Sequence, residues 1–127
     1  MIEKINETLE LLNLSDMKNS YARELSGGQK KLLELGRSLM KSPKILLLDE
    51  PLAGVNPKLS EQLLEIIFNL NKNGINILMV EHNIDAVMKI SERVVVMAEG
   101  KIISDGKPDF VRSDTNVIEA YLGSSNE

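Results

Sequence analysis

The feature that most constrains the fold is a run of four aliphatic residues, 45–48, followed directly by Asp49, Glu50 and Pro51. An apolar run without polar alternation predicts a strand buried on both faces, as in a parallel sheet between layers of helices. Asp49 and Glu50 would then lie at the carboxyl end of this strand, where open α/β sheets bind their ligands. They are candidate site residues, although an acidic pair can also simply end a strand and cap the next helix.

A second candidate site lies upstream, where Ser26, Gly27, Gly28 and Gln29 precede an amphipathic run over residues 30–40. Serine is a good helix N-cap, glycine lets another group approach the backbone, and a helix N-terminus attracts anions. The pattern predicts an anion site, and its alternative is an ordinary Ser-Gly turn before a helix. Within this helix a glycine, Gly36, costs about 1 kcal/mol relative to alanine, which predicts a tightly packed neighbour.

Another buried strand is predicted over residues 75–80, and it runs into Glu81 and His82. A helix with apolar residues at helical spacing separates the two strands. A strand, helix and strand of these lengths form a right-handed unit with parallel strands, so both strands end at one edge of the sheet. Asp49, Glu50, Glu81 and His82 are therefore expected together at that edge, although a lone histidine is more often a structural hydrogen-bonding group.

The rest of the chain predicts short helices and one β-hairpin, each marked by a capping or turn residue. Residues 123–127 are expected to be frayed. In chain order the predicted elements are a helix from Ile2, a helix over residues 83–88, a strand over 93–98, a tight turn at Glu99-Gly100 into a second strand, and short helices from Pro108 and Asp114.

Composition excludes several classes of function. The 127 residues suffice for one domain or part of one, and 43% hydrophobic with 27% charged residues is ordinary for a globular protein. The net charge of −4 and the 3% of aromatic residues argue against a nucleic-acid partner. The absence of cysteine excludes thiolate chemistry. No apolar run approaches the roughly 20 residues of a membrane-spanning helix, so no direct membrane insertion is expected.

Taken in order, these motifs resemble those of the ATP-binding-cassette (ABC) ATPases over nearly the whole chain. Residues 25–29 resemble the signature motif, residues 45–50 the Walker B motif, residues 53–57 the D-loop, and His82 the switch histidine. The family's phosphate loop, Gly-x-x-x-x-Gly-Lys-Ser/Thr, does not occur in these residues. The chain therefore resembles the C-terminal half of the family's domain, in which the phosphate loop precedes the signature motif.

The resemblance implies an α/β fold, the C-terminal portion of a P-loop NTPase domain. It would have three mainly parallel strands plus a C-terminal hairpin with flanking helices, with the phosphate-loop strand missing. Residues 1–42 would be the end of a helical subdomain and the signature helix, and residues 43–127 the Walker B, D-loop, switch-histidine and C-terminal part. In the family the missing strand lies between the strand ending at His82 and strand 93–98. These two strands are expected either to pair directly or to pair by strand exchange in a dimer.

The resemblance also implies roles for the candidate residues. Asp49 would hold Mg²⁺, Glu50 would activate the attacking water as general base, and His82 would contact the γ-phosphate of ATP. In the family two ATP-binding domains pair head to tail, so Ser26, Gly27, Gly28 and Gln29 would contact ATP bound to the partner domain. Many members have aspartate where Asn56 stands, which places the coupling between the two sites in doubt. The intact domain would be an ATPase, whereas this chain alone is predicted to be inactive.

Four segments, residues 53–58, 80–83, 87–93 and 117–123, together resemble the branched-chain amino acid importer ATPases. The rival is the lipopolysaccharide-export ATPase, which is similar over the D-loop and the C-terminal helix. A different class is a non-catalytic partner that donates signature motifs to a complete ATPase, and soluble ABC ATPases of repair or translation are a third. The importer resemblance implies membrane permease subunits as partners and a cytoplasmic location, peripheral on the inner face of the membrane through the permease.

Overall fold

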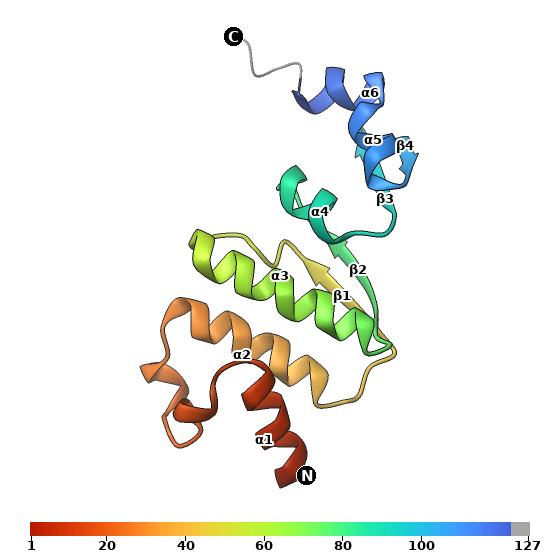
Figure 1. The fold of residues 1–127 in the computed structure, drawn as a ribbon. Helices are drawn as coiled ribbons and strands as arrows, with labels where there is room; N and C mark the ends of the chain where they lie inside the picture. Colours follow the sequence, from red (N-terminus) through yellow and green to blue (C-terminus); the bar gives the residue numbers. More distant parts are fainter. Residues whose placement is uncertain (123–127) are drawn as a thin grey trace. The chain divides into compact units, whose positions relative to one another are not determined.

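A computed structural model of the chain describes residues 1–122 (Figure 1). The segment expected to be frayed, residues 123–127, lies outside the described residues. The chain divides into two compact units, Met1–His82 and a second that begins at Asn83. The predicted division after residue 42 falls within the first unit and remains a prediction.

The first unit begins with two helices, α1 (Ile2–Leu11) and α2 (Gly27–Leu39), which are joined by short 3₁₀ turns at Ser15–Met17 and Ala22–Glu24. Ser26 caps α2, since its hydroxyl accepts a hydrogen bond from the Gln29 N–H at 3.2 Å. The Gln29 side-chain oxygen accepts in return from the Ser26 N–H at 2.8 Å. This reciprocal capping box satisfies two backbone donors and fixes where the helix starts.

Gly36 has the tightly packed neighbour that its helix position predicts. A Cβ added at Gly36 would lie 2.6 Å from Leu12 Cδ1 and 3.4 Å from Thr8 Cγ2. Leu12, just after α1, is fully buried at 0% exposure. The glycine therefore permits the contact between α1 and α2, which offsets its poor helix propensity.

A parallel strand pair follows, in which β1 (Ile45–Asp49) and β2 (Asn76–Val80) are connected by α3 (Pro57–Lys72) (Figure 1). The register runs from Ile45 opposite Asn76 to Asp49 opposite Val80. This confirms the predicted parallel unit. The α3 helix stops at Asn73, and Gly74 then takes a φ of 93°, the left-handed conformation that favours glycine after a helix.

The prediction that these strands are buried on both faces is wrong. Leu46 is 5% exposed, but Leu47 beside it is 68% exposed. In the described residues β1 and β2 form a sheet of only two strands, and α3 contacts β2. The aliphatic run favours packing of both sheet faces against other side chains, but in this unit only one face is packed. We call the uncovered side the exposed sheet face; it consists of Ile45 (58% exposed), Leu47, Leu78 (60%) and Val80 (58%).

The second unit is a β-hairpin with short helices, close to the prediction. The hairpin pairs β3 with β4 in antiparallel fashion, and Glu99 and Gly100 at its turn take φ values of 50° and 74°, as a two-residue primed turn requires. Val94, Val111 and Val117 form its buried core. Its elements are α4 (Ile84–Ile90), β3 (Val94–Ala98), β4 (Lys101–Gly106), α5 (Pro108–Ser113), α6 (Thr115–Val117) and a π-helical turn at Ile118–Leu122.

Asp114 links the hairpin to the last helices. Its carboxylate accepts from the Ser104 hydroxyl at 2.7 Å and from the Asn116 N–H at 2.9 Å, so it caps α6 as predicted. The Ser104 hydrogen bond is the main reason that the pKa of Asp114 lies below its ordinary value, with the Asn116 N–H adding to the effect.

The strands form two separate pairs in residues 1–122, β1 with β2 and β3 with β4. The third predicted strand, β3, is paired antiparallel to β4 within the second unit. Direct pairing of β2 with β3 was one of two expected outcomes; it would join the two units, and it remains a prediction. Strand exchange between two chains remains a prediction.

Candidate functional site

The first candidate residues lie where β1 and β2 end. Asp49 is the last residue of β1 and lies opposite Val80, the last residue of β2. The Glu50 N–H donates to the Val80 carbonyl at 2.8 Å, so the backbone pairing continues one residue beyond the strand. Glu50 has a φ of 45°, in the left-handed region that residues with a Cβ rarely adopt. The chain therefore turns sharply at Glu50, immediately after the sheet.

Glu50 and His82 approach each other at this edge. Glu50 Oε1 lies 3.8 Å from His82 Nδ1, and the two side chains are 52% and 75% exposed. An exposed pair at this distance contributes little to stability. The arrangement places a carboxylate and an imidazole, two groups that can transfer protons, at the carboxyl ends of parallel strands, where a ligand can reach both. The expected meeting of residues from the two strand ends is confirmed for Glu50 and His82.

Glu81 was expected at this edge but was not among the candidate site residues. Its side chain is only 1% exposed, in contrast to those of Glu50 and His82. One carboxylate oxygen accepts from the Leu52 N–H at 2.7 Å, and the other accepts from the His82 N–H at 3.2 Å. The only sequence signal for a role of Glu81 was its position beside His82. Its burial could not be predicted, because an acid after a strand usually faces water and here the turn at Glu50 encloses it.

The two signature glycines have different surroundings. A Cβ added at Gly27 would meet nothing within 4 Å, whereas one at Gly28 would collide with Leu59 Cδ2 of α3. Ser26 and Gly27 are exposed, and Gly28 and Gln29 are half-buried. The start of α2 therefore presents an open backbone at Gly27 and packs inward at Gly28. An open glycine in the first turn of a helix is the geometry that an approaching anion needs.

Asn56 is the N-cap of α3. Its side-chain oxygen accepts a hydrogen bond from the Leu59 N–H at 2.9 Å. Aspartate caps helices as well as asparagine does, so this contact explains either residue at the position. The capping contact does not bear on coupling between the two sites, and the assignment of Asn56 to the cofactor-binding residues stays a prediction.

The donor set fits a magnesium ion only as part of a nucleotide complex. Within residues 1–122 no group of three or more His, Cys, Asp or Glu side chains could hold a metal ion. Mg²⁺ in nucleotide sites is typically held by one or two carboxylates together with water and phosphate oxygens. Asp49, exposed at the end of β1, fits such a single ligand.

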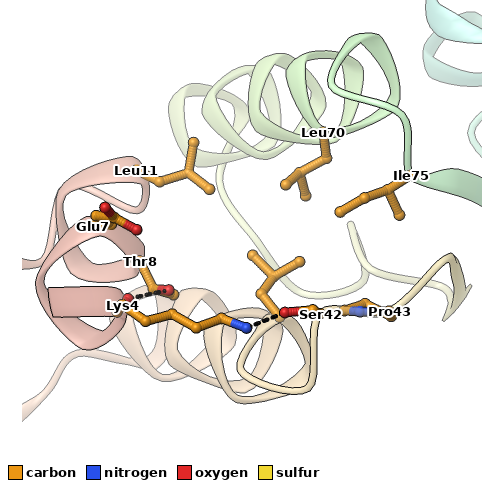
Figure 2. Close-up of a pocket in the computed structure, with 9 residues that line it drawn as sticks. Lys4, Glu7, Thr8, Leu11, Ser42, Pro43, Leu70 and Ile75 are labelled. Atoms are coloured by element: carbon orange, nitrogen blue, oxygen red, sulfur yellow. Dashed lines mark hydrogen bonds between the residues drawn. The ribbon is translucent and has the colours of Figure 1, made fainter. Parts of the chain in front are cut away.

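A hollow of about 340 Å³ lies away from these residues. Ser42, Pro43 and Ile75, which line it, precede β1 and β2, whereas Glu50 and His82 follow them. Figure 2 shows the Lys4 ammonium hydrogen-bonded to the Ser42 hydroxyl across its rim. The hollow therefore belongs to the opposite end of the strands and is not the candidate site. The other lining residues are Glu7, Thr8, Leu11, Leu39 and Leu70.

The part of the chain that the structure describes contains no helix long and apolar enough to cross a membrane.

Comparison with known proteins agrees with the motifs. A family model described as ABC transporter matches residues 1–53, and one described as branched-chain amino acid ATP-binding cassette transporter matches residues 101–126. A crystal structure of an ATP-binding cassette of an ABC transporter in its ADP conformation superposes with a TM-score of 0.86 at 41% identity, covering 96% of this chain and 50% of that chain. The chain belongs to the ATP-binding-cassette family of transporter ATPases.

Among curated relatives, the chain is 44% identical over 126 residues to the probable branched-chain amino acid transport ATP-binding protein LivG of Archaeoglobus fulgidus. That match covers 99% of this chain and 49% of the relative. The chain is 37% identical over 121 residues to the lipopolysaccharide export system ATP-binding protein LptB of Haemophilus influenzae, covering 95% of this chain and 50% of that protein. It thus spans about half the length of the relatives it matches, and the predicted resemblance to branched-chain amino acid transport ATP-binding proteins is confirmed.

Proposed function

We propose that the chain is the C-terminal half of the ATP-hydrolysing subunit of an ABC transporter that imports branched-chain amino acids. The observation that carries the proposal is the pair of exposed side chains, Glu50 and His82, 3.8 Å apart at the ends of two parallel strands. The family match at residues 101–126 and the identity to LivG support the solute class.

The chain's residues would divide the work of hydrolysis among them. Glu50 would accept a proton from the attacking water, because its carboxylate is open to solvent where the strands end. His82 would donate a hydrogen bond to the γ-phosphate and hold it near Glu50. Asp49 would hold Mg²⁺, which when bound would neutralise charge on the phosphates. The main requirement of such a reaction is correct positioning, and the paired strands supply it.

The start of α2 would serve a second ATP-binding domain. The open backbone at Gly27 and the helix N-terminus suit a phosphate that approaches from outside the chain. We therefore propose a head-to-tail dimer in which residues 26–29 close over ATP held by the partner domain. Membrane permease subunits would anchor this dimer, peripherally, on the cytoplasmic side.

The second candidate function is lipopolysaccharide export, favoured by the 37% identity to LptB over 121 residues. A transport assay separates the two. We expect a chimera that joins the N-terminal half of the A. fulgidus LivG to this chain to restore leucine uptake in cells that lack their own LivG. Restoration of lipopolysaccharide export in cells lacking LptB, without leucine uptake, would favour the second function.

The test of the catalytic assignment uses the same chimera. Glu50→Gln keeps the shape of the side chain but cannot accept the proton, so turnover should fall by about 100-fold or more while ATP still binds. Glu65→Gln, at an exposed position of α3, is the matched control and should leave turnover unchanged. Turnover of Glu50→Gln within a few-fold of the unmodified chimera would refute the general-base role.

The chain by itself should not bind Mg-ATP with micromolar affinity, because its sequence contains no phosphate-loop motif. Isothermal titration calorimetry of the 127-residue chain with Mg-ATP measures this directly. Tight binding with steady turnover would show that the chain carries a nucleotide site of its own. No binding by the chain and no turnover by the chimera would favour a non-catalytic partner.

A further inference from the structure

Glu81 is the one deeply buried carboxylate among the acids at the strand ends. We propose that Glu81 is a positioning residue that holds Glu50 and His82 in their working arrangement. The proposal rests on the function proposed above and adds a residue to it.

The two oxygens of Glu81 bind the two segments that carry the exposed pair. One oxygen accepts from the Leu52 N–H at 2.7 Å, two residues after Glu50. The other accepts from the His82 N–H at 3.2 Å. A single carboxylate therefore joins the turn that presents Glu50 to the strand end that presents His82.

The segment around Glu50 is held from both sides. The Glu50 N–H is bonded to the Val80 carbonyl at 2.8 Å, and Glu81 binds the Leu52 N–H beyond it. Between these two points the chain turns through the left-handed conformation of Glu50. Since a residue rarely stays in that conformation unless its surroundings hold it there, loss of either bond should let the turn relax.

The burial of Glu81 makes this arrangement rigid. Its side chain is 1% exposed, and Leu52 is 8% exposed. Hydrogen bonds from backbone N–H groups to a carboxylate are stronger than neutral ones, and water has little access to compete for them. A fixed carboxylate that bridges two backbone segments sets their spacing, whereas an exposed one would not.

The first experiment measures the tether in the 127-residue chain by amide hydrogen exchange. We expect Glu81→Ala to speed exchange of the Leu52 amide by about tenfold or more, since that amide loses its acceptor. Glu81→Gln keeps one acceptor oxygen and should give a smaller change. The Leu48 amide within β1 should exchange at its original rate in both variants. Unchanged exchange at Leu52 in Glu81→Ala would overturn the proposal.

The second experiment measures catalysis in the LivG chimera. A misplaced general base lowers the rate without weakening substrate binding, so Glu81→Ala should lower kcat by up to about 100-fold while KM for ATP stays within about twofold. Glu81→Gln should recover a large part of kcat, and Glu65→Ala is the control on α3. If Glu81→Ala does not fold, Glu81→Gln decides the question: it should lower kcat by about two- to tenfold with KM unchanged, and an unchanged kcat would overturn the proposal.

The outcomes separate this inference from the proposed function. Suppose that Glu50→Gln is inactive. If the Glu81 variants then keep full kcat, or if kcat falls and KM for ATP changes as well, the positioning role is wrong and the proposed function stands. If Glu50→Gln turns over ATP within a few-fold of the unmodified chimera, the general-base role in the proposed function is wrong and the positioning role falls with it. A low kcat with unchanged KM in Glu81→Ala, and recovery of kcat in Glu81→Gln, would support both the proposed function and the positioning role.

Discussion

The effect of Gly36→Ala on stability should depend on whether the Leu12 side chain is present. Gly36→Ala places a Cβ 2.6 Å from Leu12 Cδ1, so either the leucine or the helix pair must shift. In a chain that carries Leu12→Ala, the obstructing methyl group is absent. We therefore expect Gly36→Ala to destabilise the natural sequence and to stabilise the Leu12→Ala variant.

The magnitudes follow from two opposing effects. Alanine gains about 1 kcal/mol over glycine in a helix interior, while overpacking a core contact costs about 1 to 3 kcal/mol. In the natural sequence the net change in free energy of unfolding should be a loss of about 1 kcal/mol. Leu12 is 0% exposed, so Leu12→Ala alone should cost about 2 to 5 kcal/mol. In that background the helix gain of about 1 kcal/mol remains, because the Thr8 methyl at 3.4 Å can yield by a few tenths of an ångström.

The assay is urea unfolding followed by circular dichroism for the natural chain, the two single variants and the double variant. These four free energies form a double-mutant cycle, whose expected coupling is about 2 kcal/mol. An effect of Gly36→Ala that is equal in both backgrounds would refute the reasoning, since it would show that Leu12 does not limit the space at Gly36.

Three further predictions test other contacts. Gly28→Ala should destabilise the chain by about 1 to 3 kcal/mol in urea unfolding, and Leu59→Ala should suppress that loss; equal losses with and without Leu59 would contradict the packing. Leu47→Lys, on the exposed sheet face, should lower self-association measured by sedimentation velocity; association as strong as in the natural chain would exclude that face. Because the pKa of Asp114 is lowered in the folded chain, its stabilisation is present above its ordinary pKa of 3.8 and is lost as pH falls through the lower folded value. Ser104→Ala should weaken this acid dependence of unfolding, and an unchanged pH profile would argue against the hydrogen bond.

Local patterns predicted most of the elements because their signals act within a few residues. Ser26 was expected as a helix cap and forms a capping box, and the Glu99-Gly100 turn has the expected positive φ values. Gly36 could also be interpreted correctly, since a glycine inside a helix indicates a close neighbour. The parallel pairing followed from the length of the connection, which leaves little choice of topology.

What failed depended on groups distant in the sequence. The aliphatic run at β1 indicates how its side chains prefer to pack, but not whether a second layer is present, so Leu47 was wrongly expected to be buried. Glu81 went unrecognised for a similar reason. Its burial depends on the Leu52 N–H, 29 residues away in the sequence, which reaches the carboxylate only because Glu50 turns the chain.

The left-handed backbone of Glu50 has a consequence for the natural variation of this position. A residue with a Cβ at a φ of 45° costs about 1 to 3 kcal/mol, whereas glycine adopts that conformation freely. A change to glycine at Glu50 would therefore give a more stable fold that has lost its carboxylate. Selection for stability alone would therefore replace the acid. Lineages that no longer need the reaction should change toward glycine or asparagine at this position. A glutamate kept here indicates that its carboxylate is still needed for function.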